Sequence, residues 1–77
     1  MPVNEVTTAT GLETTPEALI LVLANRRVSL PWEKCSAELA RATPAECNHA
    51  ELSPGGYGIH WPLLDEDLSV TGLLRAV

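Results

Sequence analysis

The side chains with the widest range of chemistry lie close together near the end of the sequence. His60 and Trp61 follow a glycine-rich stretch, and Asp65 and Asp67 come a few residues later. An imidazole next to carboxylates can act as a general base or as a pH sensor. The sequence places no nucleophile and no second histidine to act with His60, so a structural role is the stronger interpretation of this histidine.

Three consecutive acids, Asp65 to Asp67, form the densest cluster of charge. Carboxylates of this kind could hold a divalent ion in an enzyme. Adjacent side chains in an extended loop point in different directions, however, and acids just before a helix are stabilised by the positive end of its dipole. We therefore interpret the cluster as the approach to a C-terminal helix, where Asp67 can also accept hydrogen bonds from backbone amides.

A metal site would have to combine Cys35, Cys47, His49 and His60 in the order C-x11-C-x-H-x10-H. Structural zinc sites instead use closely spaced ligand pairs that each close a small loop. The sequence therefore predicts no metal site and no cofactor, and both cysteines are expected to be free thiols. Because Cys35 lies on the apolar stripe of a predicted helix, packing in the core is favoured over thiol chemistry.

The run from Gly55 to Gly58 is similar to a phosphate-binding loop only in composition, because the Lys and Ser or Thr that should follow are missing. It is interpreted as part of a hairpin whose strands span residues 50–52 and 57–61. Side chains alternate across a strand, so Trp61 is expected in the core while His60 faces the other side.

The first part of the chain is predicted to be extended. Residues 5–10 are rich in Val and Thr and suit a strand that ends at Gly11. Residues 18–24 are continuously apolar and predict a strand covered on both faces, although the residues before them could also cap a helix. Residues 27–30 alternate polar and apolar, which predicts the return arm of a hairpin with Asn25 at positive φ in the turn.

From Trp32 onward the apolar pattern becomes helical. One face of a single predicted helix carries residues spaced by three or four positions, namely Trp32, Cys35, Leu39 and Ala42. Thr43, Pro44 and Glu46 then have the pattern of a capping box that begins a second helix of about one turn.

The core is predicted to be aliphatic with two large aromatic members. The sequence has no Phe, so Trp32 and Trp61 are expected to be substantially buried. A last helix is expected to begin at about Ser69 and to be an integral part of the fold, because it carries an apolar stripe on one face: Val70, Leu73, Leu74 and Val77.

Composition limits both the fold and the partners. A chain of 77 residues and 8.3 kDa buries about 60% of its surface on folding, so residues 1–77 are treated as a single domain. Ten acids against five bases give a net charge of −5, which disfavours nucleic acid and anionic membranes. No apolar run approaches the about 20 residues of a membrane span. The N-terminus lacks the features of a signal peptide, so a cytoplasmic location is expected.

The segment Gly58-Ile59-His60-Trp61-Pro62, continuing through Asp65-Glu66-Asp67-Leu68-Ser69, resembles a family of small bacterial proteins known as domain of unknown function family 2442. The resemblance covers roughly residues 18 to 77 and departs at residues 25–26 and 33–36. It implies a two-layer α+β fold and no established activity. It also implies that such proteins are often encoded beside another small protein, as in a toxin–antitoxin-like pair. Some relatives carry a helix-turn-helix domain, which is not expected in this chain.

The resulting prediction is an α+β fold, a small two-layer domain with one antiparallel sheet. That sheet is built from two hairpins plus an N-terminal strand, with a helix after the first hairpin and a short C-terminal helix. The first functional hypothesis is a small acidic interaction module, antitoxin-like or regulatory, that binds another small protein. The second is a ligand-binding or enzymatic domain that uses His60 with Asp65 or Asp67. The candidate interaction residues are Tyr57, Gly58, His60, Trp61, Asp65 and Asp67.

Overall fold

The computed structural model describes residues 7–75, which contain two three-stranded antiparallel sheets. The first sheet consists of β1 (Gly11–Thr14), β2 (Ala18–Val22) and β3 (Arg27–Pro31), and the second of β4 (Glu51–Leu52), β5 (Gly58–Trp61) and β6 (Glu66–Ser69). The helices are α1 (Trp32–Cys35), α2 (Ala37–Arg41), α3 (Pro44–Asn48), the 3-10 turn η1 (Pro54–Gly56) and α4 (Val70–Arg75). Every helix in this part of the chain is shorter than seven residues.

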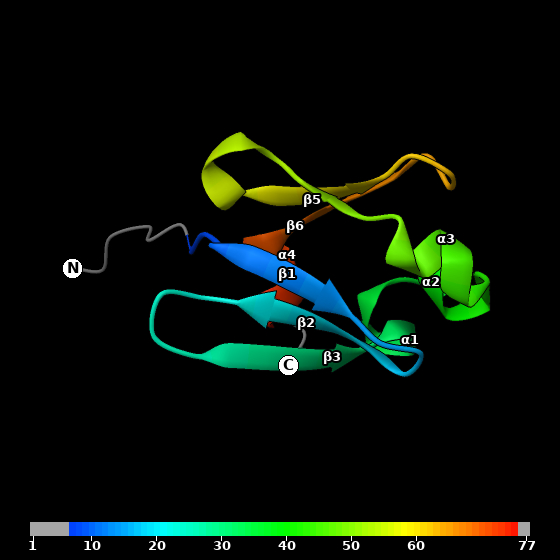
Figure 1. Ribbon diagram of the computed structural model, residues 1–77, viewed down its shortest axis with the longest axis horizontal. Coiled ribbons are helices and arrows are strands. Elements are labelled where there is room, and N and C mark those ends of the chain that lie inside the picture. Colours follow the sequence, from blue (N-terminus) through cyan, green and yellow to red (C-terminus); the bar gives the residue numbers. More distant parts are fainter. Residues whose placement is uncertain (1–6, 76–77) are drawn as a thin grey trace.

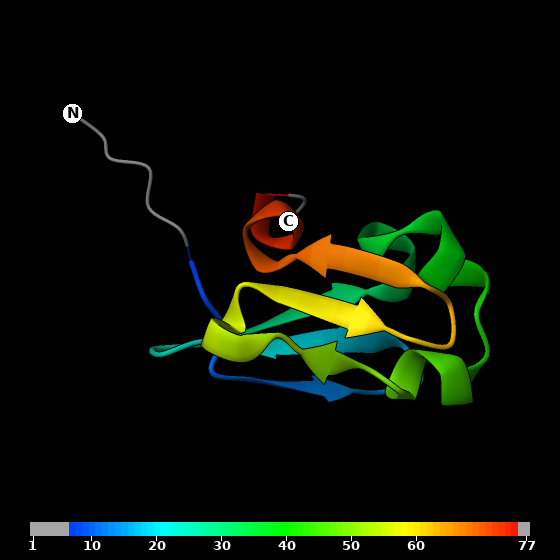
Figure 2. The same cartoon turned by 90° about the horizontal axis from the view of Figure 1, so that it is seen from above.

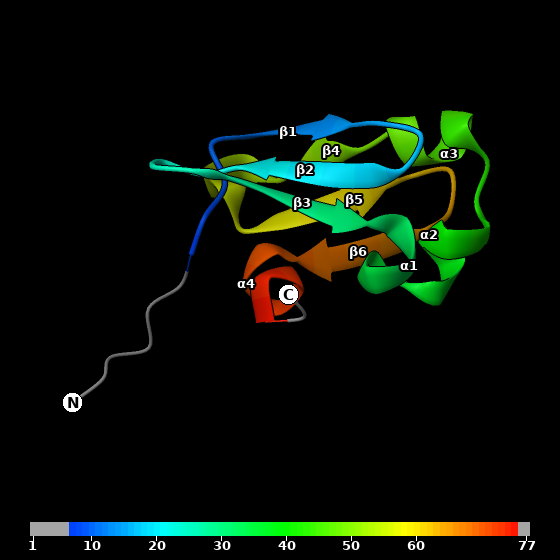
Figure 3. The same cartoon turned by 90° about the horizontal axis from the view of Figure 1, so that it is seen from below.

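The two sheets are stacked as two layers, with the second sheet above the first in Figure 1. Helices α1 to α3 gather at one end of the stack, and α4 lies along the side formed by β6 (Figures 2 and 3). The α+β class is confirmed, but the expectation of one sheet covered by helices is wrong. A second sheet forms the other layer, because the acidic segment after β5 is a strand.

The first hairpin is confirmed, with β2 pairing residue by residue with β3. Leu19 and Leu21 are fully buried, whereas the alternate residues Ile20 and Val22 are only half-buried. The strand is therefore covered on one face, not on both as predicted. The turn closes through a 2.8 Å hydrogen bond from the Leu23 N–H to the Arg26 carbonyl, and Asn25 does not adopt the predicted positive φ.

The N-terminal strand begins later than predicted. Residues 5 and 6 of the predicted strand lie outside the described residues, and residues 7–10 are not a strand. The Ala9 N–H donates a 2.8 Å hydrogen bond to the Gly56 carbonyl, which ties this segment to the turn before β5. A Cβ at Gly56, whose φ is +77°, would lie 2.0 Å from the Ala9 carbonyl oxygen. Strand β1 starts at Gly11, the residue predicted to end the strand, although the Thr10 N–H already donates a 2.8 Å hydrogen bond to the Val22 carbonyl of β2.

The single helix predicted from Trp32 to Ala42 is in fact two helices. Ser36 is fully extended, with φ −166° and ψ 162°, and its Oγ accepts a 3.1 Å hydrogen bond from the Leu39 N–H. Ser36 thus ends α1 and caps α2, as its side chain favours. The break still leaves Trp32 and Leu39 buried.

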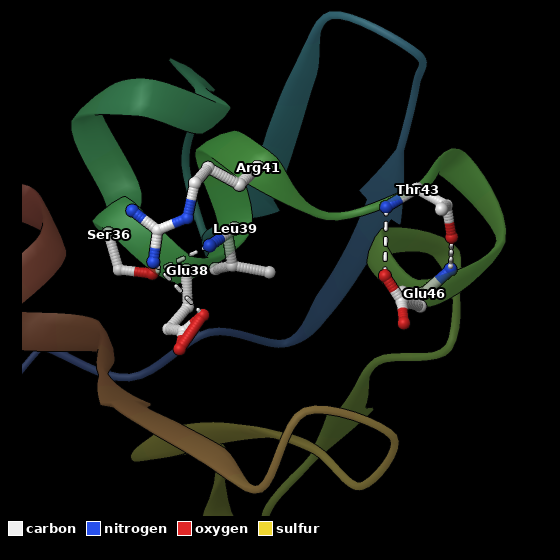
Figure 4. A network of polar contacts seen from close by, with 6 residues as sticks. All are labelled: Ser36, Glu38, Leu39, Arg41, Thr43 and Glu46. Atoms are coloured by element: carbon white, nitrogen blue, oxygen red, sulfur yellow. Dashed lines mark hydrogen bonds and ion pairs between the residues drawn. The ribbon is translucent and has the colours of Figure 1, made fainter.

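The capping box of α3 is confirmed. The Glu46 N–H donates to the Thr43 Oγ1 at 3.2 Å, and the Thr43 N–H donates to the Glu46 carboxylate at 2.9 Å (Figure 4). Pro44 occupies the first turn, where its missing N–H costs nothing. Figure 4 also shows the exposed Arg41–Glu38 pair beside the Ser36 cap.

The acidic cluster does not lie directly before a helix, so its interpretation as a helix approach is wrong. Asp65 ends the turn after β5 with φ +52°, a conformation that Asp tolerates better than most residues. Glu66 and Asp67 belong to β6, which pairs with β5. Helix α4 starts only at Val70, and Ser69 caps it as predicted by accepting a 2.9 Å hydrogen bond from the Gly72 N–H.

The C-terminal helix contributes to the core. Val70 and Leu73 are 0% and 4% exposed and Leu74 is half-buried, whereas Val77 lies outside the described residues. Since α4 has only six residues, its helicity depends on this packing and not on propensity.

The two tryptophans are buried, as expected, and connect the two sheets. Trp32 and Trp61 are buried, and their rings meet edge to face with centroids 6.4 Å apart and an interplanar angle of 81°. Each indole N–H has a carbonyl partner, Thr15 at 2.9 Å for Trp32 and Cys47 at 3.0 Å for Trp61. The pair therefore fills the core without leaving a buried donor unpaired.

Substitution of Trp61 by Ala is expected to lower the free energy of unfolding by about 3–5 kcal/mol, because it removes a fully buried indole that touches both layers. The measurement is chemical denaturation of wild type and variant. The matched control is Tyr57→Ala, which truncates an exposed aromatic and should change stability by about 0.5 kcal/mol or less. An unchanged midpoint for Trp61→Ala would contradict the central position of this side chain.

Candidate functional site

The outer face of the second sheet brings together residues from three strands. Cross-strand register places Glu51 of β4 opposite His60 of β5, and His60 opposite Asp67 of β6. Ile59 and Trp61, which alternate with His60, are buried against the first sheet. A row of an acid, an imidazole and an acid therefore crosses the side of the sheet that faces away from the core.

His60 and Asp67 form a direct pair, with the His60 Nδ1 2.7 Å from the Asp67 Oδ1. Their side chains are 41% and 76% exposed, respectively. Such an exposed contact contributes at most about 1 kcal/mol to stability. It orients the imidazole and leaves Nε2 free, as in a general base, but no nucleophile among residues 7–75 completes the pair. Asp65 has no hydrogen bond or ion pair with His60 among the described residues.

Tyr57 and Leu63 are the exposed large hydrophobic residues of the described chain, at 56% and 57%. One precedes the first residue of β5 and the other follows Pro62 just after its end. Gly58 lies between β4 and β6, where a Cβ would lie 3.3 Å from the Leu68 carbonyl oxygen. Gly58 is thus explained by close packing within the sheet, whereas Tyr57 and Leu63 are available to a partner.

Of the six candidate interaction residues, Trp61 lies in the core and not on the surface. His60 and Asp67 are brought together, whereas Asp65 sits apart in the turn. Sequence reasoning missed Glu51, which joins this row through strand register. The alternation of Glu51 with Leu52 could have indicated that Glu51 faces outward. A strand of two residues is too short, however, for its pairing with β5 to be predicted.

The net charge of the chain comes from the segment that contains this sheet. Residues 42–74 contain no Lys or Arg and five of the ten acids: Glu46, Glu51, Asp65, Glu66 and Asp67. The other five acids are balanced by the five Lys and Arg, so this segment accounts for the whole net charge of −5. The segment contains the second sheet, and Glu51, Asp65 and Asp67 are exposed. The second sheet therefore forms an acidic side that attracts cations.

The two cysteines are free, as predicted, and poorly suited to nucleophilic chemistry. Burial, and to a smaller extent Cys47, raises the pKa of the Cys35 thiol from its ordinary 9.0 to about 11. Burial and then the nearby Glu46 raise the pKa of Cys47 as well. Within residues 7–75, no group of three or more His, Cys, Asp or Glu side chains is arranged to hold a metal ion.

Two surface hollows are not lined by His60 or Asp67. One of about 290 Å³ is lined by Thr14, Thr15, Pro16, Pro44, Ala45 and Asn48. The other, of about 180 Å³, is lined by Lys34, Cys35, Leu68, Ser69, Gly72 and Leu73. Neither contains a charged pair that could activate a substrate. In the described part of the chain, no helix is both long and apolar enough to cross a membrane.

Comparison with known proteins identifies relatives but no activity. Residues 9–77 match the model of the family described as "Protein of unknown function (DUF2442)". A crystal structure of a protein of unknown function from Rhodospirillum rubrum is 28% identical, with a TM-score of 0.81 over 96% of this chain and 90% of that chain.

The solution NMR structure of an uncharacterized protein from Chromobacterium violaceum is also 28% identical, with a TM-score of 0.73 over 90% of this chain. This chain spans 65% of the length of that one. No curated protein matches the sequence. The chain therefore shares its fold with bacterial proteins whose own functions are unknown.

Both thiols are expected to be unreactive in the folded protein, because the thiolate is the nucleophile and a pKa of about 11 keeps Cys35 protonated at pH 8. Alkylation by iodoacetamide, followed by mass spectrometry, should be at least about tenfold slower than in urea. Equal rates in the two states would contradict the burial of these groups.

The raised pKa of the Cys35 thiol also makes stability depend on pH. The folded state favours the protonated thiol, so the free energy of unfolding should fall as pH rises from 9.0 toward about 11. Cys35→Ala should flatten this decline.

Proposed function

The chain belongs to the DUF2442 family of proteins of unknown function, and on that premise we propose that it is a non-catalytic module that binds another protein. The observation that carries the proposal is the composition of the second sheet. The segment that contains this sheet, residues 42–74, accounts for the whole net charge, and the exposed large hydrophobic residues of the described chain, Tyr57 and Leu63, lie at the two ends of its central strand. Protein-binding surfaces combine such aromatic or aliphatic anchors with a polar surround.

The location of the reactive groups supports this proposal over catalysis. Cys47 is buried and the pKa values of both thiols are raised. His60 and Asp67 lie on an open sheet face, where water competes with any bound substrate and weakens electrostatic stabilisation of a transition state.

A narrower form of the proposal is a neutralising, antitoxin-like role beside a small protein encoded next to it. The family resemblance suggests that arrangement, and the acidic charge suits a partner with a basic surface.

The alternative is a ligand-binding or enzymatic domain that uses the oriented imidazole of His60. The 2.7 Å contact between His60 and Asp67 is the observation that favours it. This alternative would use Glu51, opposite His60 in the sheet, as a further polar group for a bound ligand.

The test is co-expression of the chain with the product of the adjacent gene, followed by size-exclusion chromatography with light scattering. We expect a stable complex, and the double variant Tyr57→Ser/Leu63→Ser should weaken it by at least about tenfold because it removes the exposed anchors. Glu17→Gln, on the turn between β1 and β2, is the control and should have no effect. Elution of the wild-type chain alone would count decisively against the proposal.

A further inference from the structure

Strand β6 is the edge of the second sheet, and the direction of its backbone groups can be derived. The Val70 N–H donates a 2.9 Å hydrogen bond to the Tyr57 carbonyl, one pair beyond the Gly58–Ser69 pair of the ladder. Because hydrogen-bonded and non-hydrogen-bonded pairs alternate in an antiparallel ladder, Leu68 and Glu66 bond to β5. The N–H and C=O of Asp67 and the N–H of Ser69 therefore point away from β5.

On the side of β6 away from β5, helices α1 and α4 lie toward opposite ends of the strand and leave a hollow between them (Figure 3). The hollow of about 180 Å³ lies between α1 and the joint of β6 with α4, and its apolar wall is formed by Cys35, Leu68 and Leu73. No turn, cap or loop of residues 7–75 supplies a backbone hydrogen bond to Asp67 or Ser69. Both residues are exposed. The edge thus offers unpaired main-chain groups next to an apolar recess, which is the requirement for addition of a strand.

Side-chain direction then defines what such a strand would carry. A residue directly opposite Asp67 would place its side chain on the outer face, beside the Asp67 carboxylate. Its two neighbours would point to the inner side, toward the recess. Lys34 lines the recess and would repel a second cation there. A cation on the added strand is therefore favoured on the outer face, beside Asp65 to Asp67.

We propose that the free edge of β6 binds an extended segment of the protein partner, in which an Arg or Lys opposite Asp67 is flanked by apolar residues. The inference rests on the proposed function and names the binding mode and the chemistry of the partner. A second copy of this chain is disfavoured, because antiparallel pairing of two β6 strands around Asp67 would place like charges opposite each other.

The probe is a fluorescein-labelled peptide, acetyl-Thr-Val-Arg-Val-Thr-amide with a short linker, and the same peptide with Glu in place of Arg. Binding is measured by NMR titration of the full chain, together with amide hydrogen exchange. We expect the Arg peptide to bind more tightly than the Glu peptide. It should slow exchange at the amides of Asp67 and Ser69, while Leu68 is protected already in the free protein.

Charge-swap variants test the position of the cation. Asp67→Lys should lower the affinity for the Arg peptide by about tenfold and raise the affinity for the Glu peptide. Glu17→Lys, which makes the same charge change elsewhere, should change neither affinity. Asp67→Asn keeps the size of the side chain and should lower the affinity for the Arg peptide by about threefold. It replaces Asp67→Lys in the test if that variant fails to fold.

Three results would overturn the edge-binding proposal: no binding of the Arg peptide, binding without protection of the Asp67 and Ser69 amides, or equal effects of Asp67→Lys and Glu17→Lys. If any of these results is found but the chain still forms a stable complex with the adjacent gene product, only the edge-binding mode is contradicted and the proposed function is supported.

Discussion

The edge-to-face contact of Trp32 and Trp61 is the interaction on which the rest of the structure depends. The sequence lacks Phe and its one Tyr, Tyr57, is exposed, so these two rings are the aromatic side chains that fill the space between the two small sheets. Trp32 comes directly after β3 of the first sheet, and Trp61 is the last residue of β5 in the second. Their indole donors reach Thr15 before β2 and Cys47 in α3, so the pair also positions the connections at that end of the molecule. Within residues 7–75 no buried side-chain donor or acceptor is left without a partner.

The orientation of Trp61 also determines the functional side of the second sheet. With Trp61 and Ile59 turned inward, His60 must face outward between Glu51 and Asp67. The acids that would be costly in the core are thereby placed on the surface, where they give the sheet its negative charge. The core and the proposed interaction surface are two faces of the same short strands, and a one-residue change of register would exchange them.

Local signals in the sequence predicted the elements that depend on neighbouring residues. The capping box at Thr43, the Ser69 cap, both hairpins and the burial of Trp32, Trp61, Val70 and Leu73 were predictable, because each depends on side-chain chemistry or spacing within a few positions. Strand β6 was not, because three acids in a row have low strand propensity and are held extended only by pairing with β5. The break at Ser36 was hidden by apolar spacing that continues through it. The late start of β1 depends on the contact of Ala9 with Gly56, which is remote in sequence. Of the candidate site, the sequence indicated His60 and Asp67, but only the register could bring in Glu51 and the free edge of β6.

The central claim is that the tryptophan contact makes the two sheets one cooperative unit, and native-state amide hydrogen exchange tests it most directly. The slowest-exchanging amides of β2 and of β5 should report the same free energy of opening, equal to that of global unfolding, and the two values should fall together as denaturant is added. The contradicting result is exchange of the β5 amides through an opening of distinctly lower free energy while β2 stays protected, because the second sheet would then unfold independently of the first.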